Sequence, residues 1–298
     1  MHVKNSFIAM NKLFQNLRVI VSKGAFALFA AVIFSSCAAE FNRVYKSTDN
    51  NYKYEYAKEL FAMGKYSQAE NLLLELVTYM KGSENGEECL YMLAMSQFAN
   101  RDYDSSSETF KKYCTSYPKG LFAERAYFYQ ALSLYEGTPE PRLDQSLTVS
   151  AVNAMQQFID LYPESNLRGE AQQKLIELQD KLVMKELLSA RLYYKLGGYF
   201  LNCIGGGSNY EACIITSQNA MKTYPYNNYR EDFSLLIMKS KFELAEQSVD
   251  QRKMERYHDA EDECYGFINE YPDSKNRETA EKFIAKCKRY TKNYKEDM

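Results

Sequence analysis

The chain of 298 residues contains no tryptophan and only two histidines. Metal sites built on several histidines therefore cannot form, and neither can a zinc motif with two histidines on one helix. A serine–histidine–aspartate triad would depend on His258, because His2 stands at the extreme N-terminus. The formal net charge of −2 also disfavours a basic nucleic-acid binder. We therefore expect no catalytic residues, no metal, no cofactor and no nucleic-acid partner.

Residues 1–36 have the organisation of a secretory signal. They include an apolar run of ten residues, AFALFAAVIF at 25–34, which is too short to span a bilayer as a permanent helix. The segment before this run contains no acid and four bases: Lys4, Lys12, Arg18 and Lys23. Positive residues ahead of a short apolar core are typical of a signal peptide, whether translation starts at Met1 or at Met10. Its removal would leave 33 basic and 39 acidic residues, a net charge of −6.

Small residues and a cysteine follow the apolar run, in the order Phe34-Ser35-Ser36-Cys37. This arrangement resembles the lipobox of bacterial lipoproteins, although Phe34 stands where leucine is usual. The resemblance implies that Cys37 is lipidated and becomes the mature N-terminus, with residues 37–49 as an N-terminal tether. Because no aspartate follows the cysteine, it also implies sorting to the outer membrane. The alternative is an uncleaved membrane anchor.

Beyond the signal, apolar residues recur at steps of three and four, which predicts an all-α protein. Four Tyr-Pro pairs recur along the chain, with their prolines at 118, 163, 225 and 272. A small residue precedes each proline by twelve positions, and an earlier copy of the pattern has Ala69 but no proline. The small residues are Ala69, Ser106, Ala151, Cys213 and Ala260. A small residue lets two helices approach closely, and a proline ends the second helix of the pair.

These five copies resemble the tetratricopeptide repeat, a helix–turn–helix unit of about 34 residues. The fold class that follows is an all-α superhelical array of about five repeats. We expect three repeats in residues 50–165, a long connecting helix in 166–196, and two repeats with a terminal helix in 197–298. Residues 197–209 (GGYFLNCIGGGSN) lengthen one turn, and their role is open.

A five-repeat lipoprotein with a long helix after the third repeat resembles the BamD family of the β-barrel assembly machinery. The resemblance extends to short motifs: Leu143-Asp144-Gln145, Tyr-Pro-Glu-Ser at 162–165, Glu186 with Tyr193-Tyr194, and Tyr-Pro-Asp-Ser at 271–274. It implies a non-enzymatic outer-membrane scaffold and substrate receptor on the periplasmic face. It also implies that the C-terminal repeats bind a barrel-forming, BamA-like subunit, and that the N-terminal repeats bind unfolded outer-membrane proteins.

Aromatic and apolar residues recur on one face of the three first helices predicted in the N-terminal repeats. Residues seven apart lie on the same face of a helix. The candidates for a peptide groove are Tyr54, Phe61, Tyr91, Met95, Phe98, Phe128, Leu132 and Tyr135. The family resemblance supplies the ligand, an extended client peptide with aromatic side chains. The alternative is that these rings fill the core between the helices.

Basic residues gather on the last predicted helix of an otherwise acidic protein. Among them, the candidates for docking onto the barrel-forming subunit are Lys282, Lys286 and Arg289. Opposite charges speed and orient such docking more than they strengthen it. The alternative is a solvated helix face without a partner.

With Cys37 lipidated, six cysteines remain in an oxidising compartment: Cys89, Cys114, Cys203, Cys213, Cys264 and Cys287. Sequential pairing of neighbours in this order would suit helical hairpins. We favour free thiols, because Cys213 occupies a small packing position where a buried thiol fits well.

Two other functions fit the same features. One is a different tetratricopeptide-repeat lipoprotein that scaffolds cell-envelope machinery. The other is a glycan-binding lipoprotein of nutrient uptake, although such proteins are longer and rely on tryptophan platforms.

Overall fold

The computed structural model describes residues 40–198 and 208–296, and nearly all of them are helical. The predicted signal, Cys37 and most of the insertion at 197–209 lie outside the described residues. A short helical stretch at 40–45 precedes eleven longer helices within the described part. These are α2 (Asn50–Ala62), α3 (Tyr66–Tyr79), α4 (Gly86–Ala99), α5 (Tyr103–Ser116), α6 (Ala123–Glu136), α7 (Ser146–Leu161), α8 (Arg168–Leu196), α9 (Asn209–Thr223), α10 (Arg230–Glu246), α11 (Asp250–Glu270) and α12 (Arg277–Glu296). The predicted all-α array is confirmed.

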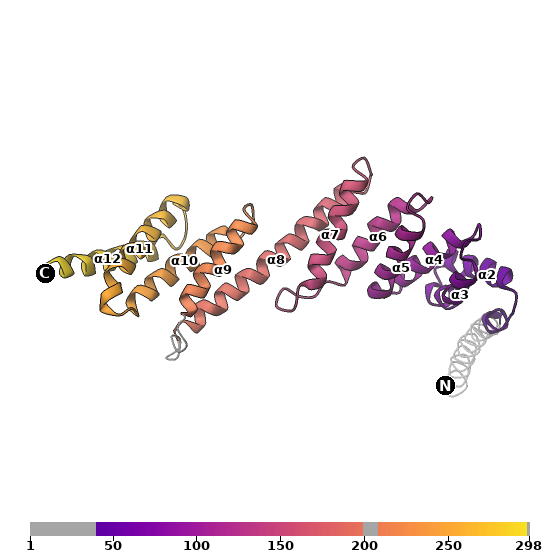
Figure 1. Cartoon of the computed structure of the whole chain (residues 1–298), viewed down its shortest axis with the longest axis horizontal. Helices are drawn as coiled ribbons and strands as arrows, with labels where there is room; N and C mark the ends of the chain where they lie inside the picture. The colour runs from indigo at the N-terminus through magenta and orange to yellow at the C-terminus, as the bar shows by residue number, and fades with distance from the viewer. Residues whose placement is uncertain (1–39, 199–207, 297–298) are drawn as a thin grey trace, which may run out of the picture. The chain divides into compact units, whose positions relative to one another are not determined.

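The described residues fall into two compact units, which divide between Gln130 and Ala131, within α6. In the first unit, α2 packs against α3, α3 against α4, and α4 against α5 (Figure 1). In the second unit, α7 and α9 both pack on α8, and α9 to α12 again pack in succession. The expected boundaries at 50–165, 166–196 and 197–298 stay a prediction.

The small residues of the repeat pattern lie in the packed core between helices. All five are completely buried: Ala69, Ser106, Ala151, Cys213 and Ala260. The Ser106 hydroxyl shows how closely the helices approach, because it donates a hydrogen bond of 3.1 Å to the backbone oxygen of Ala94 on α4. A larger side chain at such a position would force the two helices of a hairpin apart.

Each Tyr-Pro pair ends a helix. The tyrosines are the C-caps of α5, α7, α9 and α11, and their φ angles lie between −123° and −131°, outside the helical range. The proline ring clashes with a helical conformation at the preceding residue, which stops the helix there. The prediction that these pairs terminate the second helices is therefore confirmed.

An arginine five residues after the proline completes three of these turns, a feature that the Tyr-Pro pattern did not predict. In each turn the guanidinium donates a hydrogen bond of 3.1–3.2 Å to the proline carbonyl. The pairs are Arg168 with Pro163, Arg230 with Pro225, and Arg277 with Pro272. Ala123 takes the corresponding position after Pro118. The recurring bond holds the turn that leads into the next helix.

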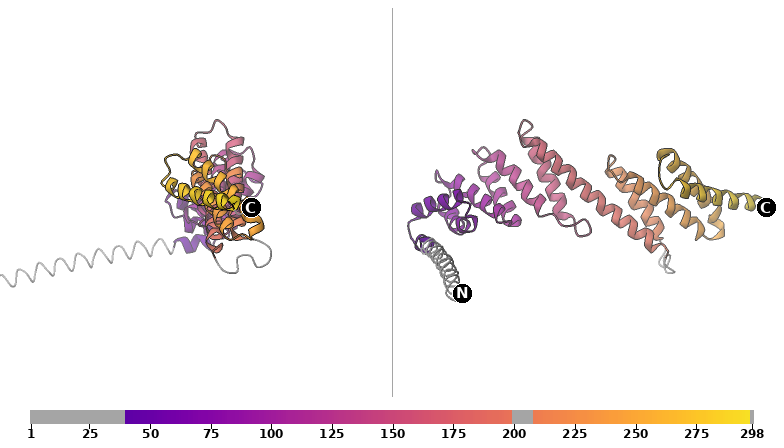
Figure 2. Two further views of the ribbon diagram at one scale, coloured as in Figure 1. Left: turned by 90° about the vertical axis from the view of Figure 1, so that its left-hand side faces the viewer. Right: turned by 180° about the vertical axis from the view of Figure 1, so that it is seen from behind.

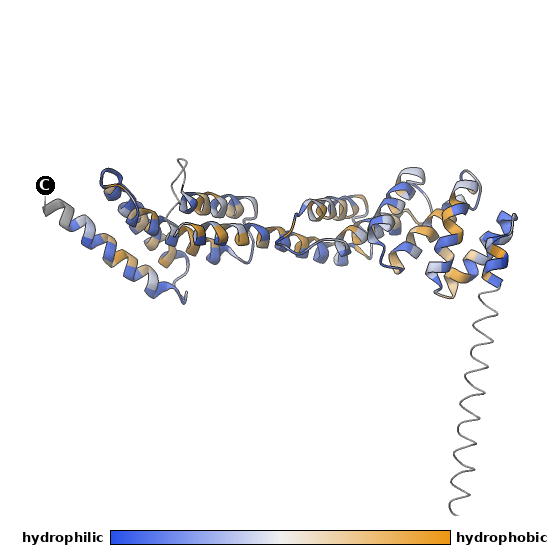
Figure 3. Cartoon of the chain, turned by 90° about the horizontal axis from the view of Figure 1, so that it is seen from below, coloured by the Kyte–Doolittle hydropathy of each residue, from blue (hydrophilic) through white to orange (hydrophobic). Residues whose placement is uncertain are grey.

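Helix α8 is a single helix of 29 residues, about 43 Å long at 1.5 Å per residue (Figure 2, right). The residues that it buries are Ala171, Leu178, Val183, Leu187 and Ala190. Hydrophobic and hydrophilic positions alternate around the helices, as expected where one face packs against a neighbour (Figure 3). Because α8 is continuous, it holds α7 and α9 at fixed positions along one rod.

Candidate functional site

Three of the aromatic rings expected to line a groove lie in the core. Tyr54, Tyr91 and Phe128 are 1%, 8% and 2% exposed. The Tyr91 ring stacks on Phe122, with 4.5 Å between ring centroids. The three rings fill the space between helices, as the alternative interpretation held, and they offer no open face to a peptide in this structure.

Three other groove candidates of the first unit, Phe61, Met95 and Phe98, are half-buried. Phe61 meets the edge of Tyr66 at 5.5 Å, and Phe98 meets the edge of Tyr103 at 5.6 Å. In each of these two repeats, an edge-to-face pair of rings connects the end of the first helix to the start of the second helix. The repeat tyrosine fixes each ring while leaving part of it accessible.

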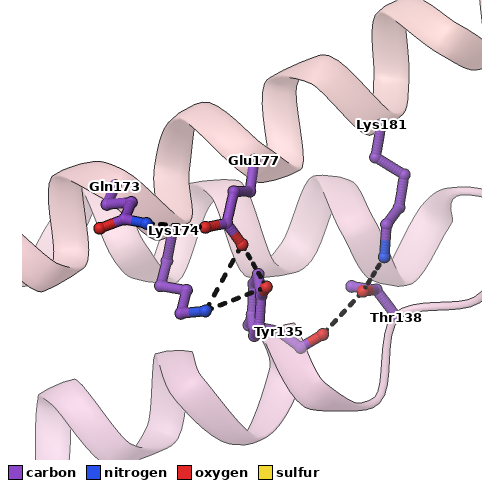
Figure 4. Close-up of polar contacts among 6 residues, drawn as sticks. All are labelled: Tyr135, Thr138, Gln173, Lys174, Glu177 and Lys181. Atoms are coloured by element: carbon purple, nitrogen blue, oxygen red, sulfur yellow. Dashed lines mark hydrogen bonds and ion pairs between the residues drawn. The ribbon is translucent and has the colours of Figure 1, made fainter.

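Leu132 and Tyr135, the groove candidates of the second unit, are also half-buried. The Tyr135 hydroxyl donates a hydrogen bond to Glu177 of α8, and the Lys174 ammonium donates one of 3.1 Å to the same hydroxyl (Figure 4). The ammonium also lies 4.3 Å from the Tyr135 ring centroid, close enough for a cation–π contact. Lys181 donates to the Thr138 hydroxyl at 2.5 Å. Tyr135 therefore connects the end of α6 to α8.

The hydrogen bond from Tyr135 lowers the pKa of the Glu177 carboxyl, and the nearby Lys174 charge lowers it further. A carboxyl with a depressed pKa stabilises the fold above its unfolded pKa, and this contribution is lost as the pH falls through its folded pKa.

We expect Tyr135→Phe to lower the free energy of unfolding by about 1 kcal/mol at pH 7, because a carboxylate loses one hydrogen bond. The difference from wild type should shrink in acid, as the pH falls through the depressed pKa of Glu177 and the carboxyl becomes protonated. Urea unfolding at pH 7 and pH 3 measures this. A difference that is the same at pH 3 and pH 7 would contradict the role given to the carboxylate.

The acidic residues at the start of α4 accept hydrogen bonds from tyrosine hydroxyls. The Tyr54 hydroxyl donates to Glu88 at 2.6 Å, and Tyr113 donates to Glu87. Lys58 pairs with Glu88 at 3.6 Å. Burial and the Glu88 contacts raise the pKa of Tyr54, so the phenol stays protonated. Acids in the first turn also interact favourably with the helix dipole, and these carboxylates hold neighbouring helices together.

The basic face of α12 is largely neutralised within the protein. Lys282 pairs with Glu278 at 2.7 Å. Lys286 pairs with Glu246 at 2.7 Å, and its ammonium lies 5.2 Å from the Phe242 ring. Arg289 is exposed and makes no ion pair with a described residue. Among the three docking candidates, Arg289 therefore has the charge most available to a partner.

Five cysteines carry free, buried thiols: Cys89, Cys114, Cys213, Cys264 and Cys287. Burial raises the pKa of Cys89, Cys114, Cys264 and Cys287 to about 12. At neutral pH these groups are almost entirely thiols, which attack disulfides and reagents slowly. The preference for free thiols is confirmed for these five residues, and Cys203 lies outside the described part of the chain.

The first unit also has an open surface on its second helices, away from the predicted rows of the first helices. Two adjoining cavities of about 560 Å³ and 470 Å³ share Val77, Leu90 and Lys112. Their walls are the second helices α3 and α5, and α4 forms the floor. The signal in the sequence was Leu74, an apolar residue of α3 that is 53% exposed.

Within the described ranges, no group of three or more His, Cys, Asp or Glu side chains is arranged to hold a metal ion. None of the helices in those ranges has both the length and the hydrophobicity to cross a bilayer.

Comparison with known proteins identifies the family. A family model described as "YfiO: Outer membrane lipoprotein" matches residues 46–205. A protein of Caulobacter vibrioides, named outer membrane protein assembly factor BamD, is 22% identical over 213 residues, which are 70% of this chain and 68% of that protein. A protein of the same name from Rickettsia prowazekii is 24% identical over 131 residues, 44% of this chain and 52% of that protein. Because the family match covers more than half of the sequence, the chain belongs to the YfiO family of outer membrane lipoproteins, whose relatives here are BamD proteins.

Proposed function

We propose that this protein is a lipid-anchored scaffold for the assembly and insertion of β-barrel proteins in the outer membrane. The observation that carries the proposal is the family match over residues 46–205, together with two relatives named as outer membrane protein assembly factors. In this proposal Cys37 bears the lipid, and the helical array lies on the periplasmic face. The protein binds other proteins and catalyses no reaction.

In this proposal the protein has two binding surfaces, one for each kind of partner. The C-terminal repeats bind the barrel-forming, BamA-like subunit, and the N-terminal repeats receive unfolded outer-membrane proteins. An exposed cation such as Arg289 would steer an acidic surface of the barrel-forming subunit toward α12. Lys282 and Lys286 would contribute less, because acidic residues of the protein itself already pair with them.

We expect Arg289→Glu to weaken capture of the barrel-forming subunit about tenfold at low salt, with a smaller effect at high salt. The double change Lys286→Glu with Arg289→Glu should weaken it further. Affinity purification of the lipidated protein, followed by quantification of the co-purified subunit, measures the effect. Lys111→Glu, at an exposed site on α5 in the N-terminal repeats, makes the same charge change and should capture the subunit like wild type.

The same purification separates the rival functions. If no barrel protein with repeated periplasmic domains accompanies the wild-type protein, a different envelope scaffold is favoured. If both variants capture the subunit as well as wild type does, the basic face of α12 is not part of the interface. The proposed function would still stand.

A further inference from the structure

Two adjoining cavities form one groove in the first unit, bounded by α3 and α5 above α4. Its apolar lining comes from Leu74 and Val77 on α3 and from Leu90 and Leu93 on α4. Along α5 the lining runs from Asp104 to Tyr117, about 20 Å at 1.5 Å per residue. This length matches about six residues of extended chain.

An unpartnered polar group lies in the floor of the groove. Gln97 is 4% exposed, and its side-chain oxygen is buried without a hydrogen-bond partner. Gln97 follows Leu90 and Leu93 on α4 with the spacing of one helix face, and all three line the same cavity. A buried carbonyl oxygen without a donor is costly. A ligand that supplies an N–H group would remove this cost.

The two ends of the groove carry opposite charges. Asp104 and Glu108 line one cavity near the start of α5, whereas Lys81 lines the other, near the end of α3. Lys112 lies where the two cavities join. Glu108, Lys112 and Lys81 are exposed, and none makes an ion pair with a described residue. Their charges are therefore available to a bound molecule.

We propose that this groove binds an extended segment of an unfolded β-barrel protein, with a basic residue at the Asp104 and Glu108 end and an acidic group near Lys81 and Lys112. The inference rests on the proposed function and gives the client a binding site. Its place differs from the first-helix rows, where three of the rings are buried.

An extended segment fits the groove better than a helix does. The backbone N–H groups of a helix are already bonded within it, so the backbone of a docked helix could not donate to the Gln97 oxygen. An extended chain offers free N–H and C=O groups to Gln97 and to the hydroxyls of Ser105 and Thr109 in the wall. Strands of outer-membrane barrels alternate apolar and polar residues, so one apolar face can lie on the leucines.

The test uses the full mature protein and two fluorescent eight-residue peptides with blocked termini. Both alternate valine and threonine, but only one has lysine at one end and glutamate at the other. Fluorescence polarisation should show that wild type binds the charged peptide more tightly than the neutral peptide. Glu108→Lys with Lys112→Glu mixes the charge signs along the groove and should weaken binding of the charged peptide about tenfold. Binding of the neutral peptide should change little.

The matched control is Glu278→Lys with Lys282→Glu on α12, another exposed pair four residues apart. It makes the same exchange of charges outside the groove and should bind both peptides like wild type.

Gln97→Met provides a second, independent variant. It keeps the approximate size of the side chain and removes the unpartnered oxygen. We expect about fivefold weaker binding of both peptides, with a melting temperature equal to or above that of wild type. Weaker binding by an equally stable protein cannot result from misfolding.

Each outcome is informative. If the charge exchange and Gln97→Met both bind the peptides like wild type, the groove is not the client site, although the proposed function stands. If wild type binds neither the peptides nor a urea-unfolded outer-membrane protein, the receptor function itself is overturned, while subunit capture through α12 is judged separately.

Discussion

Replacing Gly86 with alanine is expected to lower the free energy of unfolding by about 2–3 kcal/mol. A Cβ atom at this position would lie 2.4 Å from the backbone oxygen of Met80 and 3.0 Å from the Tyr117 hydroxyl. The Met80 carbonyl has little freedom to move, because it accepts hydrogen bonds from the backbone N–H and the hydroxyl of Ser83. The strain must therefore displace the turn between α3 and α4.

The expected sign is opposite to that of an ordinary helix, where alanine is more stable than glycine by about 1 kcal/mol. Gly266 in α11 and Gly169 in the first turn of α8 serve as controls, because a Cβ at either meets no atom within 4 Å. Alanine at these two sites should raise stability by up to about 1 kcal/mol. Urea unfolding followed by circular dichroism compares the three variants. A Gly86→Ala protein as stable as wild type would contradict the packing around α4.

Replacing Cys37 with alanine is expected to release the protein from the membrane almost completely. Each buried CH₂ of an acyl chain contributes about 0.8 kcal/mol, so one chain binds marginally and several chains anchor firmly. To avoid retention by an unprocessed leader, the variant is secreted behind a cleavable signal without a lipobox in place of residues 1–36. Fractionation into membrane and soluble material measures the change.

The control for this experiment keeps Cys37 and the native leader but replaces Cys203 with alanine. It removes one of the seven cysteines without removing the predicted lipid site, and it should remain in the membrane fraction. Membrane retention of the Cys37→Ala protein would show that lipid on this cysteine is not the anchor.

Local features of the sequence were sufficient to predict the helices. The small residue and the Tyr-Pro pair act within one hairpin, through close packing and through the clash of proline with the preceding turn. In the structure, accordingly, Tyr117 caps the end of α5 and Tyr162 caps the end of α7, as predicted. The long helix that ends at Leu196 is predicted in the same way, because residues 170–196 contain no glycine or proline.

The candidate site was less predictable, because it depends on which neighbour covers each face. Spacing of seven places Tyr54 and Phe61 on one side of α2, yet Tyr54 is 1% exposed and Phe61 is half-buried. The partner that accepts the Tyr54 hydroxyl is Glu88, 34 residues later. No local pattern relates two side chains at that separation.

The sequence by itself determined the helical repeats and the scarcity of histidine, and it predicts the signal with its cysteine, since each depends on residue type and short spacing. Only the tertiary structure decided that Tyr91 and Phe128 are core residues, that Lys286 is paired with Glu246, and that α3 and α5 leave a groove over α4. The physical reason is that burial and charge pairing are properties of helix contacts. Residues at corresponding positions of similar repeats can have different neighbours in the folded protein. Their burial and charge pairing therefore differ, although their sequence pattern is the same.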